Sequence, residues 1–385
     1  MQVERYPYRA SAWWDGRVVA RSDSCLCAET PGELPVLYFP FADIDLDGSA
    51  GLSDHVRPAQ QASELASHAA FDQDRVRIEI TDEAAGDAAR DVTVKRFPTW
   101  GDAAHLVDVM DVRPTDEGLG FFGVPRSDGR RPVVEGSQML GQAIVAASRH
   151  AAGRRVMSAS MIMLRAADAR QPLRFELVEL SSGRTFAALS AQVLQGERLC
   201  AAGTLLLDAP SADVIRHAAA APDVPGPYEC PPYDMGVTGR DIRVVDSAYS
   251  NDPDEPSGPP TLDAWVRFRH VPDDPALHAG LLAQFTGHMS IAAALRPHEG
   301  VSQDQAHHTL SMAINSISLS LYGPAKVDDW LLYHHHSTFA GAGTTHAENR
   351  VYDLDGALVA SFSVDAMVRP LPSGAKGPMD ARRAL

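Results

Sequence analysis

The histidines are the residues of this sequence whose type and spacing most directly suggest chemistry. His334 and His336 lie two residues apart in a segment that predicts a strand, so both imidazoles would share one face at a spacing compatible with metal ligation. Further imidazoles that could join them are those of His307, His308 and His346. No carboxylate or cysteine stands at a spacing that completes a recognisable zinc motif. We therefore predict no metal and no other cofactor, and a strand-surface or interface position for these histidines.

The four cysteines are the second set of reactive side chains. Cys25 and Cys27 are two residues apart in an alternating stretch, which places both thiols on one strand face. Cys200 and Cys230 are distant in sequence and complete no metal or disulfide framework. We predict four buried structural thiols.

The composition excludes several classes of protein. The 385 residues are 45% hydrophobic, which is ordinary for a globular protein, and this length predicts two or three domains. The formal net charge of −16 argues against nucleic acid and against an anionic membrane as partners. The sequence has no apolar run of about 18 residues and no apolar signal core at its N-terminus. We therefore expect a soluble, cytoplasmic protein.

Residues 1–113 predict a small, mostly β domain. Asp15-Gly16 is a tight-hairpin signal between two short strand-like runs. One short helix is expected at residues 102–110. The expected strands are residues 11–14, 17–20, 36–39, 76–80 and 92–97.

Two longer segments, residues 118–208 and 233–370, each predict one buried helix and several long strands. Residues 136–150 and 275–295 are largely apolar and predict the two helices. Asp355-Gly356 predicts a tight turn in the second segment. The expected strands are residues 156–164, 173–180, 185–195 and 199–207 in the first segment, and 242–248, 261–270, 310–321, 330–339, 344–352 and 358–368 in the second.

The same plan therefore occurs twice in one chain. A Pro-rich linker, residues 209–232, separates the copies and is expected to be extended and poorly structured, and the tail, residues 371–385, is expected to be disordered. One central helix followed by four long antiparallel strands is typical of the hotdog fold. We predict an α+β protein in which a small β domain precedes a double hotdog.

Short motifs of the two longer segments resemble those of acyl-CoA thioesterase II proteins. Residues 136–143 (GSQMLGQA) resemble that family's GGQVVGQA, residues 163–168 (MLRAAD) its FLRPGD, and residues 182–186 (SGRTF) its DGNSF turn. LRPH at 295–298, WLLY at 330–333 and DGALVAS at 355–361 follow in the family's order and spacing. The resemblance covers about 250 residues. It implies a double hotdog that acts on an acyl thioester, carried by coenzyme A or by a carrier protein, with hydrolysis as the default reaction and a homodimer as a possible assembly.

The resemblance also implies a mechanism in which an Asp, a Thr or Ser, and a Gln orient a water against the thioester carbonyl. The positions of this sequence that match those three residues are Gly287, Ile314 and Val364. None of these side chains offers a base or a hydrogen-bond acceptor. The sequence therefore predicts a non-standard catalytic set.

Neighbouring residues could supply the missing groups. His288 follows Gly287 and could act as the base, with Thr286 before it, because imidazole titrates near neutral pH. Asn315 and Ser316 lie beside the vacated hydroxyl position and could donate to the thioester oxygen. At the start of the first helix, Gln138 and the backbone amides near Gly136 could hold the thioester carbonyl, and Glu135 could point into the same pocket or cap the helix.

Two other functions are compatible with these residues. PVVEG at residues 132–136 resembles the PVMPG that precedes the helix in hotdog dehydratases, but the position of the dehydratase acid is Gly141 here. A non-hydrolytic enzyme of specialised metabolism, a dehydratase, isomerase or cyclase, is one alternative. A non-catalytic acyl-binding or scaffold protein is the other.

The N-terminal domain resembles a second family over residues 7–113. VVARS at residues 18–22 and YFPFADI at residues 38–44 are similar to the signature of domain of unknown function 427. That family's CPYKG segment is missing near residues 67–71. The resemblance implies an architecture and no activity, and we expect Trp13, Trp14, Tyr38 and Phe39 in the core.

Overall fold

The structure is a computed structural model, and it describes most of the chain. The described residues are 2–6, 9–29, 36–59, 65–73, 75–82, 93–97, 103–115, 120–123, 133–231, 233, 240–249, 256–268, 271–306 and 309–371. The chain divides into two compact units, residues 1–105 with 231–241, and residues 106–230 with 242–385. The predicted tail, His307 and His308 lie outside the described residues.

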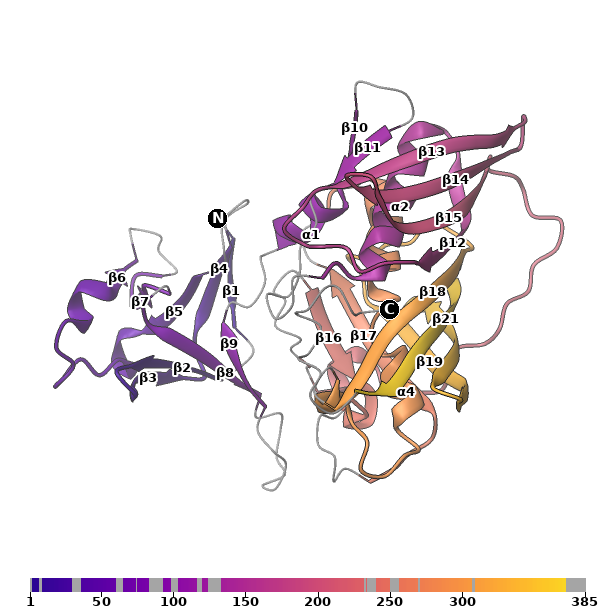
Figure 1. The fold of residues 1–385 in the computed structure, drawn as a ribbon. Helices are drawn as coiled ribbons and strands as arrows, with labels where there is room; N and C mark the ends of the chain where they lie inside the picture. The colour runs from indigo at the N-terminus through magenta and orange to yellow at the C-terminus, as the bar shows by residue number, and fades with distance from the viewer. Residues whose placement is uncertain are drawn as a thin grey trace. The chain divides into compact units, whose positions relative to one another are not determined.

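The first unit is built from two antiparallel sheets (Figure 1). One has the order β1 (Gln2–Arg5), β4 (Leu26–Glu29), β5 (Val36–Pro40), β7 (His68–Phe71) and β6 (Val56–Pro58), and the other β3 (Arg17–Ser22), β2 (Arg9–Trp14), β8 (Arg77–Asp82) and β9 (Thr93–Phe97). Asp15 and Gly16 both have positive φ, as the predicted hairpin turn between β2 and β3 requires. The small, mostly β unit at the N-terminus is confirmed.

A single hydrophobic core holds these two sheets together. Phe39, Cys25 and Cys27 lie in it, while Trp14 packs at its edge. Burial raises the pKa of the Cys25 thiol to about 12, so this cysteine stays a protonated packing residue at neutral pH. All four cysteines are buried and unpaired by disulfides, as predicted.

The second unit is dominated by one twelve-stranded sheet in which the two hotdogs are continuous. Strands β12 and β18 join the halves, with Ser158 opposite Ser320 and Ser160 opposite Ser318. In sheet order the strands are β10 (Arg113–Pro114), β11 (Gly120–Gly123), β13 (Leu173–Ser182), β14 (Phe186–Gln195), β15 (Arg198–Asp208), β12 (Arg155–Met163), β18 (Leu310–Leu321), β21 (Leu358–Pro370), β20 (Thr344–Tyr352), β19 (Leu331–Gly341), β17 (Thr261–Phe268) and β16 (Arg240–Val244). The double hotdog is confirmed (Figure 1).

Four α-helices of the described residues lie against this sheet or lead into it. The buried helix α2 (Gly136–His150) has the predicted bounds, and α1 (Ala103–Met110) precedes it. The predicted helix at residues 275–295 is wrong as one element, because it is broken into α3 (Pro275–Phe285) and α4 (Ser290–Leu295). The break coincides with Met289, whose φ of 67° no continuous right-handed helix allows. None of the helices that the structure describes is long and apolar enough to cross a membrane.

The linker between the hotdogs is extended, as predicted, but its second half is anchored to the sheet. Tyr352 donates its hydroxyl to the carbonyl of Ala220 at 3.0 Å, and the Trp265 indole donates to Pro225 at 2.9 Å. Cys230 is buried among the same aromatic residues. The expectation of a poorly structured linker is therefore wrong for residues 220–230, where aromatic side chains of the second hotdog bind its carbonyls. The strand predicted at 242–248 ends early, at Val244, where a short 3-10 turn begins.

Candidate active site

The central helices of the two hotdogs pack antiparallel, with backbone against backbone. A β-carbon on Gly141 of α2 would lie 2.4 Å from the carbonyl oxygen of Gly280 in α3. At one end of the pair, Arg149 of α2 lies 3.7 Å from Asp274, the N-cap of α3. The N-terminus of α2 therefore meets the C-terminus of α3, which brings residues about 150 positions apart in sequence into one place.

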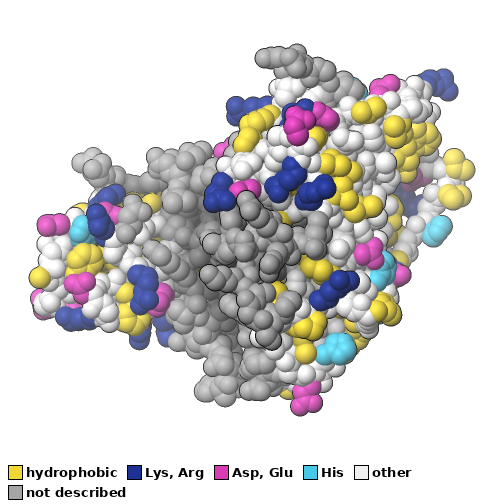
Figure 2. All heavy atoms as spheres, in the orientation of Figure 1, with side chains coloured by type: hydrophobic (Ala, Val, Ile, Leu, Met, Phe, Trp, Pro, Cys, Tyr) yellow, Lys and Arg dark blue, Asp and Glu magenta, His cyan; other side chains and the backbone are white. Residues whose placement is uncertain are grey.

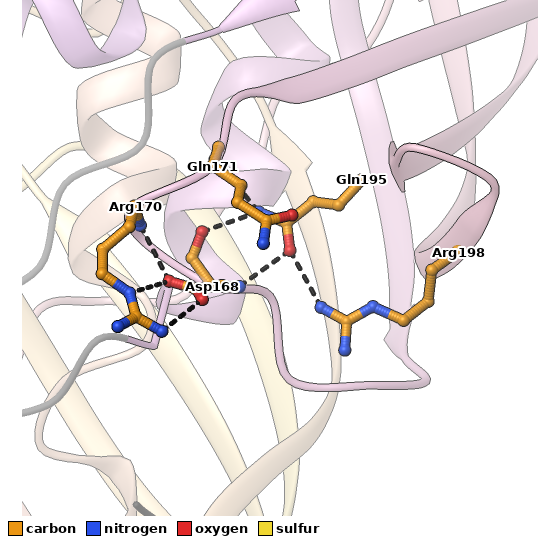
Figure 3. Close-up of polar contacts among 5 residues, drawn as sticks. All are labelled: Asp168, Arg170, Gln171, Gln195 and Arg198. Atoms are coloured by element: carbon orange, nitrogen blue, oxygen red, sulfur yellow. Dashed lines mark hydrogen bonds and ion pairs between the residues drawn. The ribbon is translucent and has the colours of Figure 1, made fainter. Parts of the chain in front are cut away.

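A polar cluster in the first hotdog holds the loop that pairs with the residues immediately before α2 (Figure 3). Gln195 binds the loop after β12, because its amide oxygen accepts from the Asp168 backbone at 2.8 Å and its amide nitrogen donates to the Asp168 carbonyl at 2.7 Å. The side-chain hydrogen bond from Arg170 holds the pKa of Asp168 at about 2. The same loop pairs with the residues that precede α2, since Val134 donates its backbone amide to Ala167 at 2.9 Å.

The break between α3 and α4 places His288 at the junction. Thr286 ends α3 by donating its hydroxyl to the Ala283 carbonyl at 2.6 Å. Two residues after His288, the hydroxyl of Ser290 lies 3.2 Å from Nδ1 of the buried His335 on β19. Met289 between them is held in the left-handed region. The loop that carries His288 is thus fixed on both sides.

Three side chains converge where α2 begins and α3 ends. The Gln284 amide nitrogen lies 3.2 Å from Oε2 of Glu135 and 3.3 Å from Nε2 of His288. His288 Nε2 lies 3.5 Å from the same Glu135 oxygen. The His288 side chain is 11% exposed and that of Glu135 is 45% exposed, so the cluster reaches from the interior to the surface. An imidazole beside a carboxylate and an amide is a constellation suited to proton transfer.

Glu135 reaches this cluster because it does not cap its own helix. It is the N-cap residue of α2, but its side chain makes no capping hydrogen bond. The carboxylate instead lies near Gln284 and His288 of the other hotdog. Of the two positions that the sequence left open for the Glu135 side chain, the structure shows no cap on α2 and places the carboxylate beside Gln284 and His288.

Two further polar groups at the start of α2 are buried and have no hydrogen-bond partner in the described part of the chain. They are the hydroxyl of Ser137, in a residue that is 1% exposed, and the amide nitrogen of Gln138, in a residue that is 3% exposed. Gly136, the first residue of the helix, lies against the side chain of Met163. A β-carbon on Gly136 would lie 2.6 Å from the Cε of Met163. Buried polar atoms without partners are uncommon and indicate a place for a ligand or water.

The other predicted residues lie elsewhere. Thr286 is fully buried and its hydroxyl is used within α3. Asn315 is exposed at a β-bulge between Ile314 and Ser316. The bulge turns Ser316 away from the helices, and its hydroxyl donates to Asp365 at 2.6 Å. The structure therefore does not bring these three hydroxyl and amide groups to His288.

Gln284 and Ser137 were missed by the sequence reasoning. Gln284 lies four residues before His288, a spacing that puts both on one side of a helix, and that signal was available. Ser137 stands inside the GSQ motif but suggested nothing by itself. Its place opposite Gly287 follows only from the helix crossing.

Two models of known protein families match the double hotdog. The model of the acyl-CoA thioesterase N-terminal domain matches residues 126–207, and that of the acyl-CoA thioesterase C-terminal domain matches residues 216–367. The chain belongs to the acyl-CoA thioesterase family. Within this hydrolase family, the structure resembles the thioesterase II type of double hotdog.

Individual relatives agree with the family match. Acyl-coenzyme A thioesterase 8 of Mus musculus is 24% identical over 332 residues, which is 75% of this chain and 97% of the mouse protein. Acyl-CoA thioesterase 2 of Haemophilus influenzae is 23% identical, over 69% of this chain and 97% of its own. The tesB protein of Mycobacterium avium subspecies paratuberculosis shares the fold with a TM-score of 0.59 at 24% identity, over 70% of this chain and all of its own. An acyl-CoA thioesterase II of Mycobacterium marinum has a TM-score of 0.58, also at 24% identity, over 70% of this chain and 99% of its own.

Gly141 is the position that matches the acid of hotdog dehydratases, and it leaves no room for an acidic side chain. A β-carbon on Gly141 would meet the Gly280 carbonyl at 2.4 Å and the Met110 sulfur at 2.9 Å. Any larger side chain would have to push the two central helices apart. An acid of the dehydratase type therefore cannot be placed there without moving α3.

The triple histidine of β19 separates into different environments. His334 Nδ1 pairs with Asp263 at 2.7 Å, whereas burial lowers the pKa of His335 to about 3. His346 of β20 pairs with Asp365 at 2.7 Å. In the part of the chain that the structure describes, no three His, Cys, Asp or Glu side chains are grouped closely enough to hold a metal ion.

A groove of about 710 Å³ lies where β12 and β18 join the two hotdogs. Glu135, Gln284 and His288 are not among the residues that line it. Its hydroxyl groups alternate along the strands with buried residues such as Ala159 and Leu319. Thr204 and Tyr322 contribute two of them, and the others come from Ser158, Ser160, Ser318, Ser320, Ser361 and Ser363. No histidine is among the described residues that line it, and its one carboxylate is that of Glu348.

Exposed hydrophobic side chains accompany the hydroxyl groups on this unit. Figure 2 shows hydrophobic side chains gathered over the part of the second unit where Figure 1 places β13 and β14. On these two strands Val178, Leu180 and Phe186 are each at least half exposed. Exposed apolar surfaces of this kind are typical of interfaces.

Proposed function

We propose that the chain hydrolyses acyl-CoA thioesters at the junction of α2 with α3 and α4, with His288 as the general base. The observation that carries this proposal is the convergence of Glu135, Gln284 and His288 within 3.5 Å of one another. These residues stand beside Gly287, the position that matches the catalytic Asp of thioesterase II proteins. The acyl-CoA substrate is taken from the family and from the names of the relatives.

The geometry supports a direct attack of water on the thioester. Neutral His288 accepts a proton from water at Nε2, the ring nitrogen that faces Gln284 and Glu135. The water oxygen bonds to the carbonyl carbon, the C–S bond breaks, and the departing thiolate takes the proton from the imidazolium. The products are a carboxylic acid and a free thiol.

Glu135 and Gln284 assist this proton transfer without forming bonds to substrate. The carboxylate of Glu135 favours the imidazolium that forms when His288 takes a proton, because opposite charges 3.5 Å apart attract. Gln284 is 3% exposed and its amide spans both partners, so it holds the imidazole at a fixed distance from the carboxylate.

The carbonyl oxygen of the thioester fits the start of α2. Backbone amides of a first helical turn have no acceptor within the helix and stabilise developing negative charge. The buried amide nitrogen of Gln138 is available beside them. Preorganised donors of this kind stabilise the tetrahedral oxyanion more than the substrate.

The experiment is product analysis with the full-length chain on a panel of thioesters. Short, medium, long and aromatic acyl-CoAs are compared with the same acyl groups on a carrier protein, and both free thiol and free acid are measured. Equal release of thiol and acid from acyl-CoAs supports the proposal. Bound acyl-CoA that releases neither product would contradict it and favour an acyl-binding role, and a changed acyl group on an intact thioester would favour a non-hydrolytic enzyme.

A further inference from the structure

The side chain of Ser137 occupies the space that a side chain at position 287 would fill. A β-carbon on Gly287 would lie 2.2 Å from the Ser137 Oγ and 2.7 Å from its Cβ. The next atom on that side is Cδ1 of Ile314, at 3.5 Å. Positions 287 and 314, which match the Asp and the hydroxyl residue of thioesterase II proteins, therefore do meet in space, and Ser137 lies against position 287.

Two departures from the thioesterase II pattern thus touch each other. GSQ at residues 136–138 stands where the pattern has GGQ, so a glycine has become Ser137. Gly287 stands where the pattern has an acid, so a large side chain has become a glycine. With both exchanges, one side chain still fills the space between α2 and the α3–α4 break, but it comes from the first hotdog.

The hydroxyl that fills this space has an unused hydrogen-bonding capacity. Ser137 is 1% exposed, and its Oγ has no hydrogen-bond partner among the residues that the structure describes. Ile314 closes the space with an apolar methyl group that can offer none. A hydroxyl can both donate and accept, and burial without a partner is unfavourable. A water molecule beside the Ser137 Oγ would supply the missing hydrogen bond.

We propose that Ser137 binds the attacking water and replaces the missing acid and hydroxyl of the thioesterase II pattern. This inference rests on the proposed hydrolysis at His288. Oγ accepts a hydrogen bond from one O–H of the water, while the other proton passes to His288 as the water oxygen bonds to the carbonyl carbon. Ser137 itself forms no covalent bond and ends the reaction as it began.

The test uses Ser137→Ala, with Ser148→Ala as the matched control in the same helix. Ser148 donates its hydroxyl to the Ile144 carbonyl at 2.9 Å, which is an ordinary intrahelical bond. Ser137→Ala is expected to lower kcat about 10- to 100-fold with little change in KM, because it removes a group that acts on the water and not on the acyl-CoA. Ser148→Ala is expected to keep the wild-type kcat.

A pair of substitutions at positions 137 and 287 tests whether a side chain at either position can bind the attacking water. Ser137→Gly lowers kcat in the same way, and adding Gly287→Asp to it is expected to recover at least about tenfold, since the carboxylate then enters the space that the serine leaves. Gly287→Asp alone is expected to be worse than the pair, because both side chains compete for that space. Thermal midpoints measured on each variant separate loss of activity from loss of fold.

Several results would overturn the inference while leaving the proposed function intact. They are wild-type kcat in a folded Ser137→Ala, no recovery in the folded double variant, or an acyl group found on Ser137 by mass spectrometry after a rapid quench. Absence of thiol release by the wild-type chain is a different failure, and it would overturn the proposed hydrolysis itself.

Discussion

Gly141 of α2 and Gly280 of α3 lie backbone against backbone where the two hotdogs meet, since a β-carbon on Gly141 would lie 2.4 Å from the Gly280 carbonyl oxygen. Gly141→Ala is therefore expected to push the helices apart and to destabilise the fold by about 1–3 kcal/mol. A chemical or thermal unfolding curve checks this. Gly323→Ala is the matched control, because a β-carbon there meets no atom within 4 Å. An equal stability of both variants would refute the close packing.

The carboxylate of Glu135 is expected to act on the reaction and hardly on the fold. Glu135→Gln keeps the shape but removes the charge beside His288, so kcat should fall about 10- to 100-fold. The side chain is 45% exposed, and exposed ion pairs add little stability, so the thermal midpoint should stay close to that of the wild type. Steady-state kinetics and a melting curve measure the two quantities. A large loss of stability with unchanged kcat would assign Glu135 a structural role instead.

The buried His335 predicts how stability depends on pH. Burial lowers its pKa from 6.5 to about 3, so the folded state takes up the proton at lower pH than the unfolded state does. The contribution of neutral His335 to the free energy of unfolding is complete above about pH 6.5. It is lost as the pH falls toward 3, by at most roughly 1.4 kcal/mol per pH unit. His335→Gln can still hydrogen-bond Ser290 but cannot titrate. The difference in unfolding free energy between wild type and variant should shrink or reverse between pH 6.5 and 4, and a difference that stays constant would show that His335 is not held neutral.

The Asp168 cluster is expected to influence catalysis from outside the site. The Arg170 hydrogen bond holds the pKa of Asp168 at about 2, so the stabilisation that its charge provides is complete above about pH 4 and is lost as the pH falls toward 2. Asp168→Asn removes that charge at all pH values and loosens the loop that pairs with Val133 and Val134. We expect a several-fold lower kcat. We also expect that the decrease in unfolding free energy between pH 4 and 2, which the wild type shows, is absent from the variant. An unchanged acid-unfolding profile would show that the ion pair does not hold the loop.

Much of the fold could be predicted from local sequence patterns. Strands 310–321 and 344–352 and helix 136–150 were predicted with the observed bounds, because alternation and helical periodicity run the full length of each. The break in 275–295 could not be seen in this way. It depends on the positive φ of Met289 and on the hydrogen bond from Ser290 to His335, which lies 45 residues later in the chain.

The candidate site was predictable in its parts but not in its assembly. Glu135 and His288 were each chosen for their chemistry and place, yet their contact exists only because two glycines let α2 and α3 cross closely. Asn315 and Ser316 were chosen because they follow Ile314, the position that matches the hydroxyl residue of the family. A one-residue bulge between Ile314 and Ser316 directs their side chains away from His288. A bulge of this kind changes which face a side chain occupies without leaving a clear sign in the sequence.

The most direct test of the account is the ratio of kcat/KM between wild type and His288→Ala for thiol release from the best acyl-CoA substrate. His217→Ala serves as the matched control, because His217 lies exposed in the linker. The account predicts that His288→Ala lowers kcat/KM about 10²- to 10⁴-fold, as expected for loss of a general base, while His217→Ala leaves it unchanged. A folded His288→Ala protein that hydrolyses acyl-CoA at the wild-type rate would contradict the account.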